Sequence, residues 1–280
     1  MSFIDKQYNR DRIAEMILES LNHSFNELQH QFEASKSHIG YFFLDNVLPM
    51  ELAKKIYDNF PSKEEVYLKK SIREFKYVTA QMNKYHPLLE EVIYAFQDNR
   101  VVDVISKICG CIEVQPDDNL YAGGISMMGE GNYLNPHLDN SHDKDRNLWR
   151  ALNLLYYVTP EWSLENGGNL ELWPNGIGGD PLVIESKFNR LVVMSTHKRS
   201  WHSVNEVRID SVRCCVSNYY FSKEPIDSQK GFHVTTFRAR PGQYFKNKVL
   251  QIDSGLRMAL RKVFKKGVKE NPHVYKKNNR

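Results

Sequence analysis

The run RALNLLYYVT (150–159) combines aliphatic and aromatic residues and ends before a proline. A short run of this composition predicts a β-strand. Similar runs recur after Pro116, separated by Gly, Asn, Pro or Asp: they are NLYAGGISMM (119–128), GNLELWP (168–174), PLVIES (181–186), NRLVVMST (189–196) and RCCVSNYYFS (213–222). This series predicts antiparallel strands arranged as a barrel or a sandwich.

The chain before Pro116 has a different pattern, in which apolar residues recur at helical spacing among charges. A short strand in YFFLD and a turn at Asn46 interrupt this pattern. We expect helices over residues 8–34, 49–60 and 87–109, and an amphipathic helix over 246–266. The predicted fold class is therefore mainly β with a helical buttress (α+β).

The change of pattern divides the chain into three regions. Residues 1–115 are expected to form a helical and strand buttress of the same domain, and residues 116–222 the β core. Residues 223–280 form a C-terminal extension whose predicted amphipathic helix is basic. The whole is long enough to bury a sizeable core.

Composition places the chain among ordinary globular proteins. Of 280 residues, 41% are hydrophobic and 26% are charged, and the net charge is only +4. The lysines cluster in the last thirty residues, away from any candidate site, so we do not expect a nucleic acid partner.

The four cysteines, Cys109, Cys111, Cys214 and Cys215, have neither zinc-ribbon nor disulfide-framework spacing. The polar N-terminus lacks the apolar core of a signal peptide, and no apolar stretch approaches the ~18 residues of a membrane span. These observations predict a reduced, cytoplasmic protein without a membrane span.

The tripeptide His137-Leu-Asp139 is a candidate metal site. A strand places residues i and i+2 on the same face, so both side chains can point at one ion. A second imidazole would complete the two-His, one-carboxylate arrangement that leaves positions open on ferrous iron. Among the candidates His197, His202 and His233, we select His202 in SWHSV because it has a strand environment, whereas His197 in THKRS is expected in a turn.

Arg213 opens the strand RCCVSNYYF and is a candidate anion-binding residue. We expect this strand to form a hairpin with the strand of His202, through a turn at residues 206–210, which would bring Arg213 close to His202. A buried arginine needs an anionic partner, and its forked donors suit a carboxylate. By alternation, Cys215, Ser217 and Tyr219 are expected to point inward with it.

These motifs resemble, in order and spacing, the 2-oxoglutarate- and Fe(II)-dependent oxygenases, specifically the prolyl 4-hydroxylase-like branch. The resemblance covers about 121–222 and rests on these segments: HLD (137–139), LNLLYYVTPEW, ENGGNLELWP, KFNRLVVMS, WHSV and R-x-x-x-x-x-x-Y-F (213–221). It implies a double-stranded β-helix (jelly-roll) core.

The resemblance also implies roles for individual residues. His137, Asp139 and His202 would bind Fe(II), and Arg213 would pair with the far carboxylate of 2-oxoglutarate. Other positions match the co-substrate pocket or the turn beside it: Tyr157, Gly167, Gly168, Ser217 and Tyr219. The chain departs from many relatives at Met127 and Met128, where a tyrosine contacts the co-substrate, and the nearby tyrosine is Tyr133.

The implied reaction decarboxylates 2-oxoglutarate with O2 to succinate and CO2 while hydroxylating an aliphatic carbon, and ascorbate could stimulate it. We expect a polar, anionic small-molecule substrate. Arg238 and Arg240, beside Pro241-Gly242, would bind its carboxylate or phosphate if they reach the mouth, but could instead brace the C-terminal helix. A prolyl hydroxylase acting on a peptide is the alternative, and a non-catalytic cupin-like binding protein is the alternative from another class. A homodimer through the C-terminal helix is a further expectation.

Two residues near these motifs are expected to be bystanders. His142, in HLDNSHD, has a spacing that fits no ligand role, so we predict that it lies on the surface. Arg208 could rival Arg213, but it lies in the predicted turn and is expected to be solvated.

Overall fold

A computed structural model describes residues 8–227, 231–264 and 275. Six α-helices lie in these residues: α1 (Arg10–His23), α2 (Phe25–Ser35), α3 (Met50–Asp58), α4 (Pro87–Phe96), α5 (Asn99–Cys109) and α6 (Tyr244–Val263). The strands before the predicted core are β1 (Tyr41–Asp45), β2 (Tyr67–Lys70), β3 (Glu74–Thr79) and β4 (Val114–Pro116). The later strands are β5 (Gly124–Met128), β6 (Tyr133–Leu138), β7 (Trp149–Tyr157), β8 (Leu170–Leu172), β9 (Leu182–Ile184), β10 (Arg190–Ser195), β11 (His202–Val204), β12 (Arg213–Ser222) and β13 (Thr236–Phe237).

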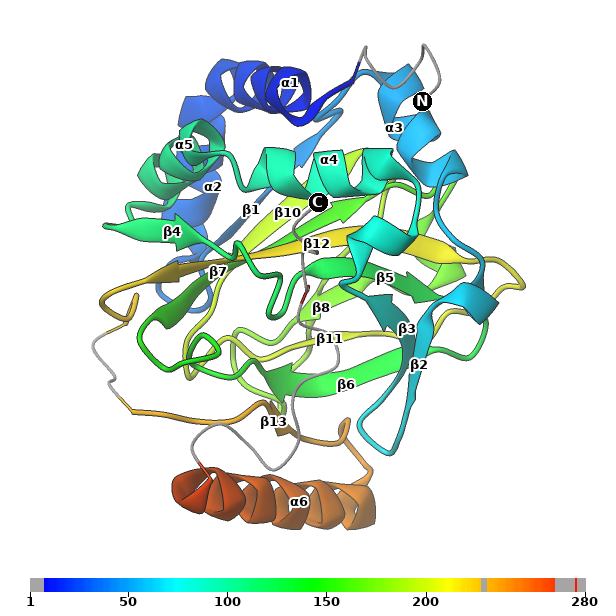
Figure 1. The fold of residues 1–280 in the computed structure, drawn as a ribbon. Helices are drawn as coiled ribbons and strands as arrows, with labels where there is room; N and C mark the ends of the chain where they lie inside the picture. Colours follow the sequence, from blue (N-terminus) through cyan, green and yellow to red (C-terminus); the bar gives the residue numbers. More distant parts are fainter. Residues whose placement is uncertain (1–7, 228–230, 265–274, 276–280) are drawn as a thin grey trace.

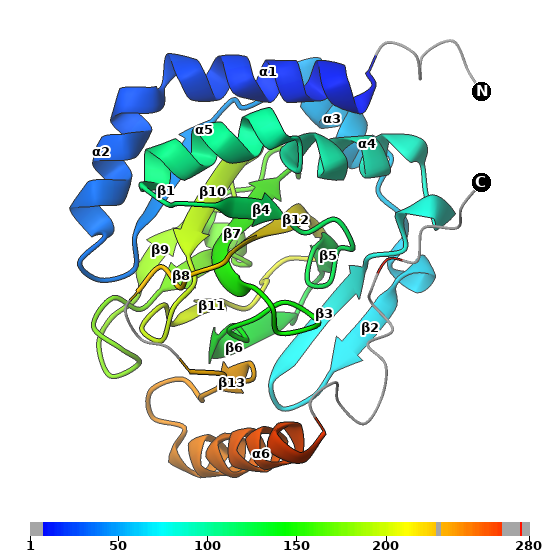
Figure 2. The same cartoon turned by 60° about the vertical axis from the view of Figure 1, so that its left-hand side comes forward.

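The strands form one curled antiparallel sheet in the order β1-β10-β7-β12-β5-β3-β6-β11-β8-β9. Strand β3 pairs with both β5 and β6, so it joins the broad half of the sheet to the half formed by β6, β11, β8 and β9. The two halves face each other, and the curl is visible in Figure 1 and Figure 2. The prediction of a mainly β fold with helices around a double-stranded β-helix is confirmed.

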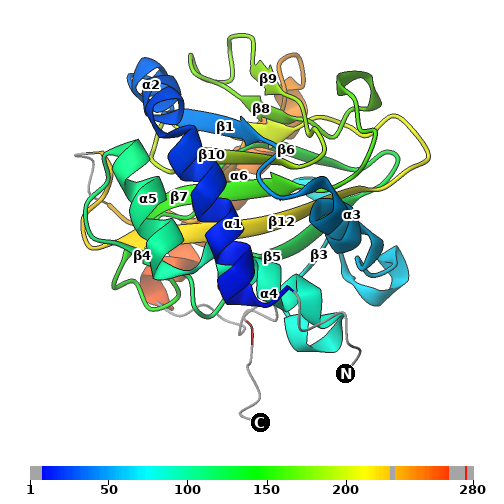
Figure 3. The same cartoon turned by 90° about the horizontal axis from the view of Figure 1, so that it is seen from above.

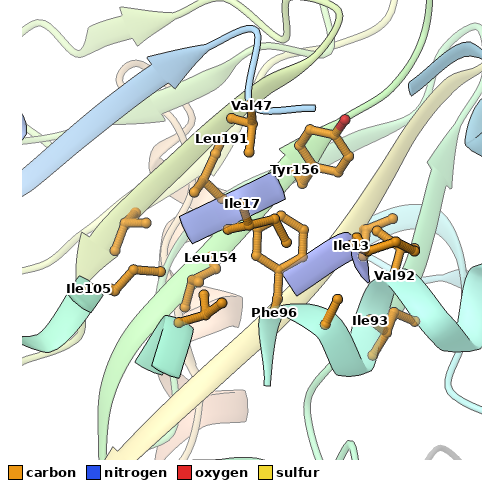
Figure 4. Close-up of a cluster of buried hydrophobic side chains, with 14 of the residues drawn as sticks. Ile13, Ile17, Val47, Val92, Ile93, Phe96, Ile105, Leu154, Tyr156 and Leu191 are labelled. Atoms are coloured by element: carbon orange, nitrogen blue, oxygen red, sulfur yellow. The ribbon is translucent and has the colours of Figure 1, made fainter. Parts of the chain in front are cut away.

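Helices α1 to α5 cover the outer face of the broad half-sheet, as the view from above in Figure 3 shows. Their buried stripes meet the apolar side of β7, β10 and β12. Figure 4 shows this core, in which Ile17, Phe96 and Ile105 of the helices lie against Leu154 and Leu191 of the strands. Burial of this apolar surface is the main term that stabilises the fold and holds the broad half-sheet rigid.

Helix α6 lies on the opposite side of the molecule, beyond β6 and β13 (Figure 1). Its buried residues are Leu250 and Ser254, and the Ser254 hydroxyl accepts a hydrogen bond from the Phe237 backbone N–H. The predicted amphipathic helix over 246–266 is therefore present to Val263, and residues 265–266 lie outside the described residues. No helix in the described part of the chain combines the length and apolar character needed to cross a membrane.

Two helices predicted in the N-terminal region needed correction. The expected helix over 8–34 is two helices that separate at Ser24, and the expected helix over 87–109 is two helices because Asp98 caps the second one with its side chain. The hairpin of β2 and β3 was not predicted, because charged residues interrupt the apolar residues of its strands. Strands β1, β2 and β3 join the sheet of the predicted core. The division of the chain at residues 115 and 222 stays a prediction.

Candidate functional site

A cavity of about 530 Å³ opens between the two halves of the curled sheet. Strand β6 and strand β11 bring His137 and His202 to it as directly paired residues. Asp139 follows β6 by one residue and lies on the same side as His137. Other predicted site residues also line the cavity: Tyr157, Arg213, Ser217 and Tyr219.

His137, Asp139 and His202 form a compact, buried group. Nε2 of His137 lies 3.7 Å from Oδ1 of Asp139, and Nε2 of His202 lies 3.7 Å from Oδ2. One ligand atom from each residue lies within 4.8 Å of the others. Among the described residues, this is the one group of His, Cys, Asp or Glu side chains close enough to hold a metal ion.

Hydrogen bonds to the backbone fix how the two histidines present their rings. Nδ1 of His137 lies 3.0 Å from the Asn135 carbonyl oxygen, and Nδ1 of His202 lies 2.9 Å from the Ser200 carbonyl oxygen. Each Nδ1–H therefore donates to its own strand, which leaves the Nε2 lone pair free toward Asp139. Burial, followed by the neighbouring His202, lowers the pKa of His137 to about 3, so His137 is neutral near pH 7.

These donors fit a divalent metal ion. Two imidazole lone pairs face a carboxylate, so acceptors meet acceptors without a proton between them, and Oδ2 of Asp139 is buried without a hydrogen-bond partner. Burial opposes ionisation of Asp139, but Arg150 and the histidines outweigh it and lower the pKa to about 2. A cation at the centre would satisfy all three groups, and two histidines with one carboxylate suit Fe(II).

Arg150 contacts the carboxylate of Asp139. Its guanidinium lies 3.4 Å from Oδ1 of Asp139 and 4.2 Å from the ring centroid of Tyr219. Since Arg150 is only 5% exposed, little water can replace this contact. Sequence reasoning missed Arg150, although its place at the start of β7 could have suggested an inward-facing cation.

Arg213 and Tyr157 form a second polar group in the cavity. Arg213 is 3% exposed, its Nε has no hydrogen-bond partner, and no acidic side chain of the described residues lies within ion-pair distance. The guanidinium lies 5.3 Å from the ring centroid of Tyr157, whose buried hydroxyl also lacks a partner. Burial raises the pKa of Tyr157, so the phenol stays protonated and can donate a hydrogen bond. Two unsatisfied donor groups side by side suit an incoming carboxylate.

The glycine turn before β8 allows the close packing around Arg213. Gly168 has φ +66°, and a Cβ atom there would lie 3.2 Å from Cδ of Arg213. At Gly167, with φ +73°, a Cβ atom would lie only 1.9 Å from a backbone carbonyl oxygen of Glu206. Both positions therefore require glycine.

The part of the chain that contains this site matches the profile of a known family. Residues 123–221 match the profile of the 2OG-Fe(II) oxygenase superfamily. The chain contains a 2OG-Fe(II) oxygenase domain. The predictions of this family and of a dioxygenase are confirmed.

Solved structures share the fold of the oxygenase domain at low sequence identity. A prolyl-4-hydroxylase from Pseudomonas putida has a TM-score of 0.52 and 16% identity, over 70% of this chain and 100% of the other. A prolyl 4-hydroxylase from Phytophthora capsici has a TM-score of 0.50 and 15% identity, over 91% and 79% of the two chains. An oxidoreductase of the 2OG-Fe(II) oxygenase family from Burkholderia pseudomallei has a TM-score of 0.50 and 16% identity, over 71% and 91%. No curated protein matches the chain.

The predicted hairpin between the strands of His202 and Arg213 is wrong. In the oxygenase domain β11 pairs with β6 and β8, whereas β12 pairs with β4, β5 and β7. Residues 205–212 cross from one half-sheet to the other, so the two side chains reach the cavity from opposite halves. Ser217 and Tyr219 point inward as predicted, while Cys215 is buried beside Tyr157.

The other predicted histidines and arginines lie outside the metal group. His142 is buried rather than on the surface, because residues 142 and 149 form a β-bridge that stacks its ring 4.0 Å from that of Trp149. His197 lies in a turn and Arg208 is exposed, as predicted. His233 contacts Ser141 through its backbone N–H and is not part of the group.

Arg238 and Arg240 do not line the cavity of the oxygenase domain. Arg240 contacts Glu171 with one nitrogen 2.7 Å from Oε2 and another 3.1 Å from Oε1, and donates to the Val204 carbonyl oxygen. It therefore braces the C-terminal segment against β8 and β11. Of the two alternatives left open for these arginines, the contacts of Arg240 favour the bracing role.

Proposed function

We propose that the chain is an Fe(II)- and 2-oxoglutarate-dependent hydroxylase in which His137, Asp139 and His202 hold the iron. The observation that carries this proposal is the pair of imidazoles whose Nδ1 atoms bond to the backbone and whose Nε2 atoms face one ionised, partly unsatisfied carboxylate. When bound, Fe(II) supplies the redox chemistry that couples oxidative decarboxylation of 2-oxoglutarate, to succinate and CO2, with hydroxylation of an aliphatic carbon.

Arg213, Tyr157 and Ser217 would bind the far carboxylate of 2-oxoglutarate. Arg213 and Tyr157 approach the cavity from the neighbouring strands β12 and β7. The burial of both side chains keeps water away from the ion pair and strengthens it. The co-substrate would then be held with its other end toward the metal group, which lies on the opposite half-sheet.

The chain has Met127 and Met128 where many relatives carry a tyrosine near the keto-acid end of 2-oxoglutarate. Met128 lines the cavity, while Met127 belongs to the hydrophobic core on the other side of β5. Ser126, two residues before Met128, faces the cavity as well. We propose that Ser126 supplies the polar contact at this position.

The substrate is proposed to be an anionic small molecule hydroxylated at an aliphatic carbon. Seven cationic side chains line the cavity against two acidic ones, Glu74 and Asp139. The cations are Lys69, Arg73, Lys76, Arg150, Arg213, Arg257 and Arg261. This excess supports an anion even after one arginine is assigned to 2-oxoglutarate. A peptidyl proline is the alternative.

The test is a screen for substrate-stimulated succinate formation with the iron-loaded protein. We expect stimulation by compounds that carry a carboxylate or phosphate, and none when 2-oxoglutarate is omitted. Stimulation by neutral proline peptides alone would select the alternative. Absence of turnover with every compound, together with unmeasurable Fe(II) binding, would contradict the proposed reaction itself.

We also propose that α6 mediates a homodimer. Its outward face carries a stripe of exposed apolar residues: Phe245, Val249, Ile252, Leu256, Leu260 and Val263. Their spacing of three and four residues is that of a helix-pairing seam. Light scattering of the wild type and of an Ile252→Glu, Leu256→Glu variant tests this, and a monomeric wild type would contradict it. A cytoplasmic location and stimulation by ascorbate stay predictions.

A further inference from the structure

Two lysines face each other across the β2–β3 hairpin at the edge of the cavity. Lys69 and Lys76 are directly paired in the antiparallel register, and both line the cavity. Like charges directly opposite each other destabilise a strand pair. Half-burial makes this arrangement more costly. Burial is the larger cause that lowers the pKa of Lys69, and the positive charge of Lys76 is the next.

The neighbouring carboxylate compensates for only part of this charge. Nζ of Lys76 lies 3.2 Å from Glu74, and these side chains are 20% and 18% exposed. Burial raises the pKa of Glu74, but Lys76 and Lys69 outweigh it and lower the pKa to about 2. Lys69 has no hydrogen bond or ion pair among the described residues. One carboxylate therefore serves two ammonium groups.

The loop of the hairpin and helix α6 extend the positive charge. Nε of Arg73 lies 3.6 Å from Oδ2 of Asp253, within ion-pair range but too far for a hydrogen bond, and Arg257 contacts the same carboxylate at 3.0 Å. Lys69, Arg73, Lys76 and Arg257 thus face two acids, Glu74 and Asp253. The cluster carries two positive charges in excess.

The cluster lies beside the proposed iron site and away from the proposed 2-oxoglutarate site. Strand β3 is the sheet neighbour of β6, which carries His137, and Glu74 pairs in register with Leu134 of β6. Arg213 enters the cavity from β12, on the other half-sheet. A ligand bound at the hairpin would therefore reach the iron from the open side.

We propose that Lys69 and Lys76, supported by Arg73, form a subsite for a doubly negative oxyanion carried by the substrate, of which a phosphate monoester is the simplest. This inference rests on the proposed function and specifies its substrate class. The excess of two charges matches a dianion, and the ammonium groups of Lys69 and Lys76 provide several donors for its oxygens, while the Arg73 guanidinium adds positive charge nearby. The rest of the substrate would extend from this anchor toward the metal group.

The hairpin contains its own control residue. Lys70 follows Lys69 but points to the opposite face, where its ammonium lies 4.7 Å from the ring centroid of Phe75, and it does not line the cavity. Lys69→Met and Lys70→Met therefore remove the same charge from adjacent positions, one inside and one outside the proposed subsite.

The experiment measures binding of methyl phosphate to the full-length protein by calorimetry at low ionic strength, with saturating 2-oxoglutarate and Fe(II) and without oxygen. We expect Lys69→Met to weaken binding by roughly tenfold or more and Lys70→Met to leave it nearly unchanged. Lys69→Met should not lower the melting temperature of the phosphate-free protein, because it removes a like-charge contact.

Three results would overturn the proposal. The first is that methyl phosphate does not bind the wild type. The second is that Lys70→Met weakens binding of methyl phosphate as much as Lys69→Met does. The third is that Lys69→Met weakens binding of 2-oxoglutarate and leaves binding of methyl phosphate unchanged. A parallel measurement without iron or 2-oxoglutarate separates this proposal from the proposed reaction. If methyl phosphate binds in this measurement but the iron-loaded protein shows no turnover in the substrate screen, the subsite is supported and the proposed reaction is contradicted.

Discussion

Replacement of Arg213 by alanine separates binding of the co-substrate from stability of the fold. Arg213 is 3% exposed and has no acidic partner among the described residues. In the complex, the far carboxylate of 2-oxoglutarate would be its counterion. Truncating one partner of a buried, hydrogen-bonded charge pair costs about 2–5 kcal/mol.

That free energy corresponds to a 2-oxoglutarate Kd raised roughly 30-fold to a few thousand-fold. The ligand-free protein should lose less stability than after an ordinary core truncation. Removal of a buried charge that has no partner is favourable for the folded state, and it offsets the free energy lost with the packing of the side-chain stem. We therefore expect little or no decrease in the ligand-free melting temperature.

The assay is calorimetric titration of 2-oxoglutarate into iron-loaded protein without oxygen, with urea unfolding of the ligand-free protein in parallel. Arg208→Ala is the matched control, because Arg208 is exposed on the crossing segment. Unchanged affinity in Arg213→Ala, or a loss in Arg208→Ala of similar size, would refute the assignment. Iron content should remain equal in all three proteins.

Three further predictions concern stability. Arg240→Ala should destabilise the fold by about 3 kcal/mol in urea unfolding, because Glu171 would remain as a buried and poorly compensated charge; a loss below about 1 kcal/mol would contradict the bracing role. Gly167→Ala should cost about 2 kcal/mol or more, whereas Gly176→Ala, with a similar positive φ but open space around it, should cost less; equal losses would mean that strain alone acts. Burial raises the pKa of Asp45, but two hydrogen-bonded cations outweigh it and lower the pKa. The contribution of Asp45 to the free energy of unfolding is therefore complete above its unfolded-state pKa of about 4, and it is lost as the pH falls through the lower pKa of the folded state. Asp45→Asn should remove this part of the acid dependence of stability. An unaltered dependence of unfolding on pH would contradict the prediction.

The metal group could be predicted from the sequence because strand geometry is local. Alternation along β6 places His137 and Asp139 on one face, and the strand character of WHSV distinguishes His202 from His197. The inward positions of Ser217 and Tyr219 follow from the same rule. Each of these predictions needs only the side-chain period of a single strand.

Features that depend on which strands pair could not be predicted in the same way. The path of residues 205–212 between the half-sheets depends on the curl of the whole sheet, so a hairpin appeared to be the simplest connection. Burial of His142 depends on a bridge to Trp149 that no pattern along the chain indicates. The facing positions of Lys69 and Lys76 likewise follow from the register of a polar hairpin.

Caps and breaks within the helical region have local causes that the apolar period conceals. The stripe of apolar residues continues through Ser24 and through Asp98, so it predicts one helix in each case. The Asp98 side chain, however, accepts a hydrogen bond from the backbone N–H of Arg100 and begins a new helix. Such caps are visible in the sequence when they are sought within a run as well as at its ends.

Equilibrium dialysis against Fe(II) without oxygen is the most direct test of the central claim that His137, Asp139 and His202 form the iron site. We predict one tightly bound Fe(II) per chain, lost in His137→Ala, Asp139→Ala and His202→Ala, and retained in His197→Ala. Circular dichroism of each variant would show that the fold persists. Full Fe(II) binding by folded His202→Ala, or its loss in His197→Ala, would contradict the account.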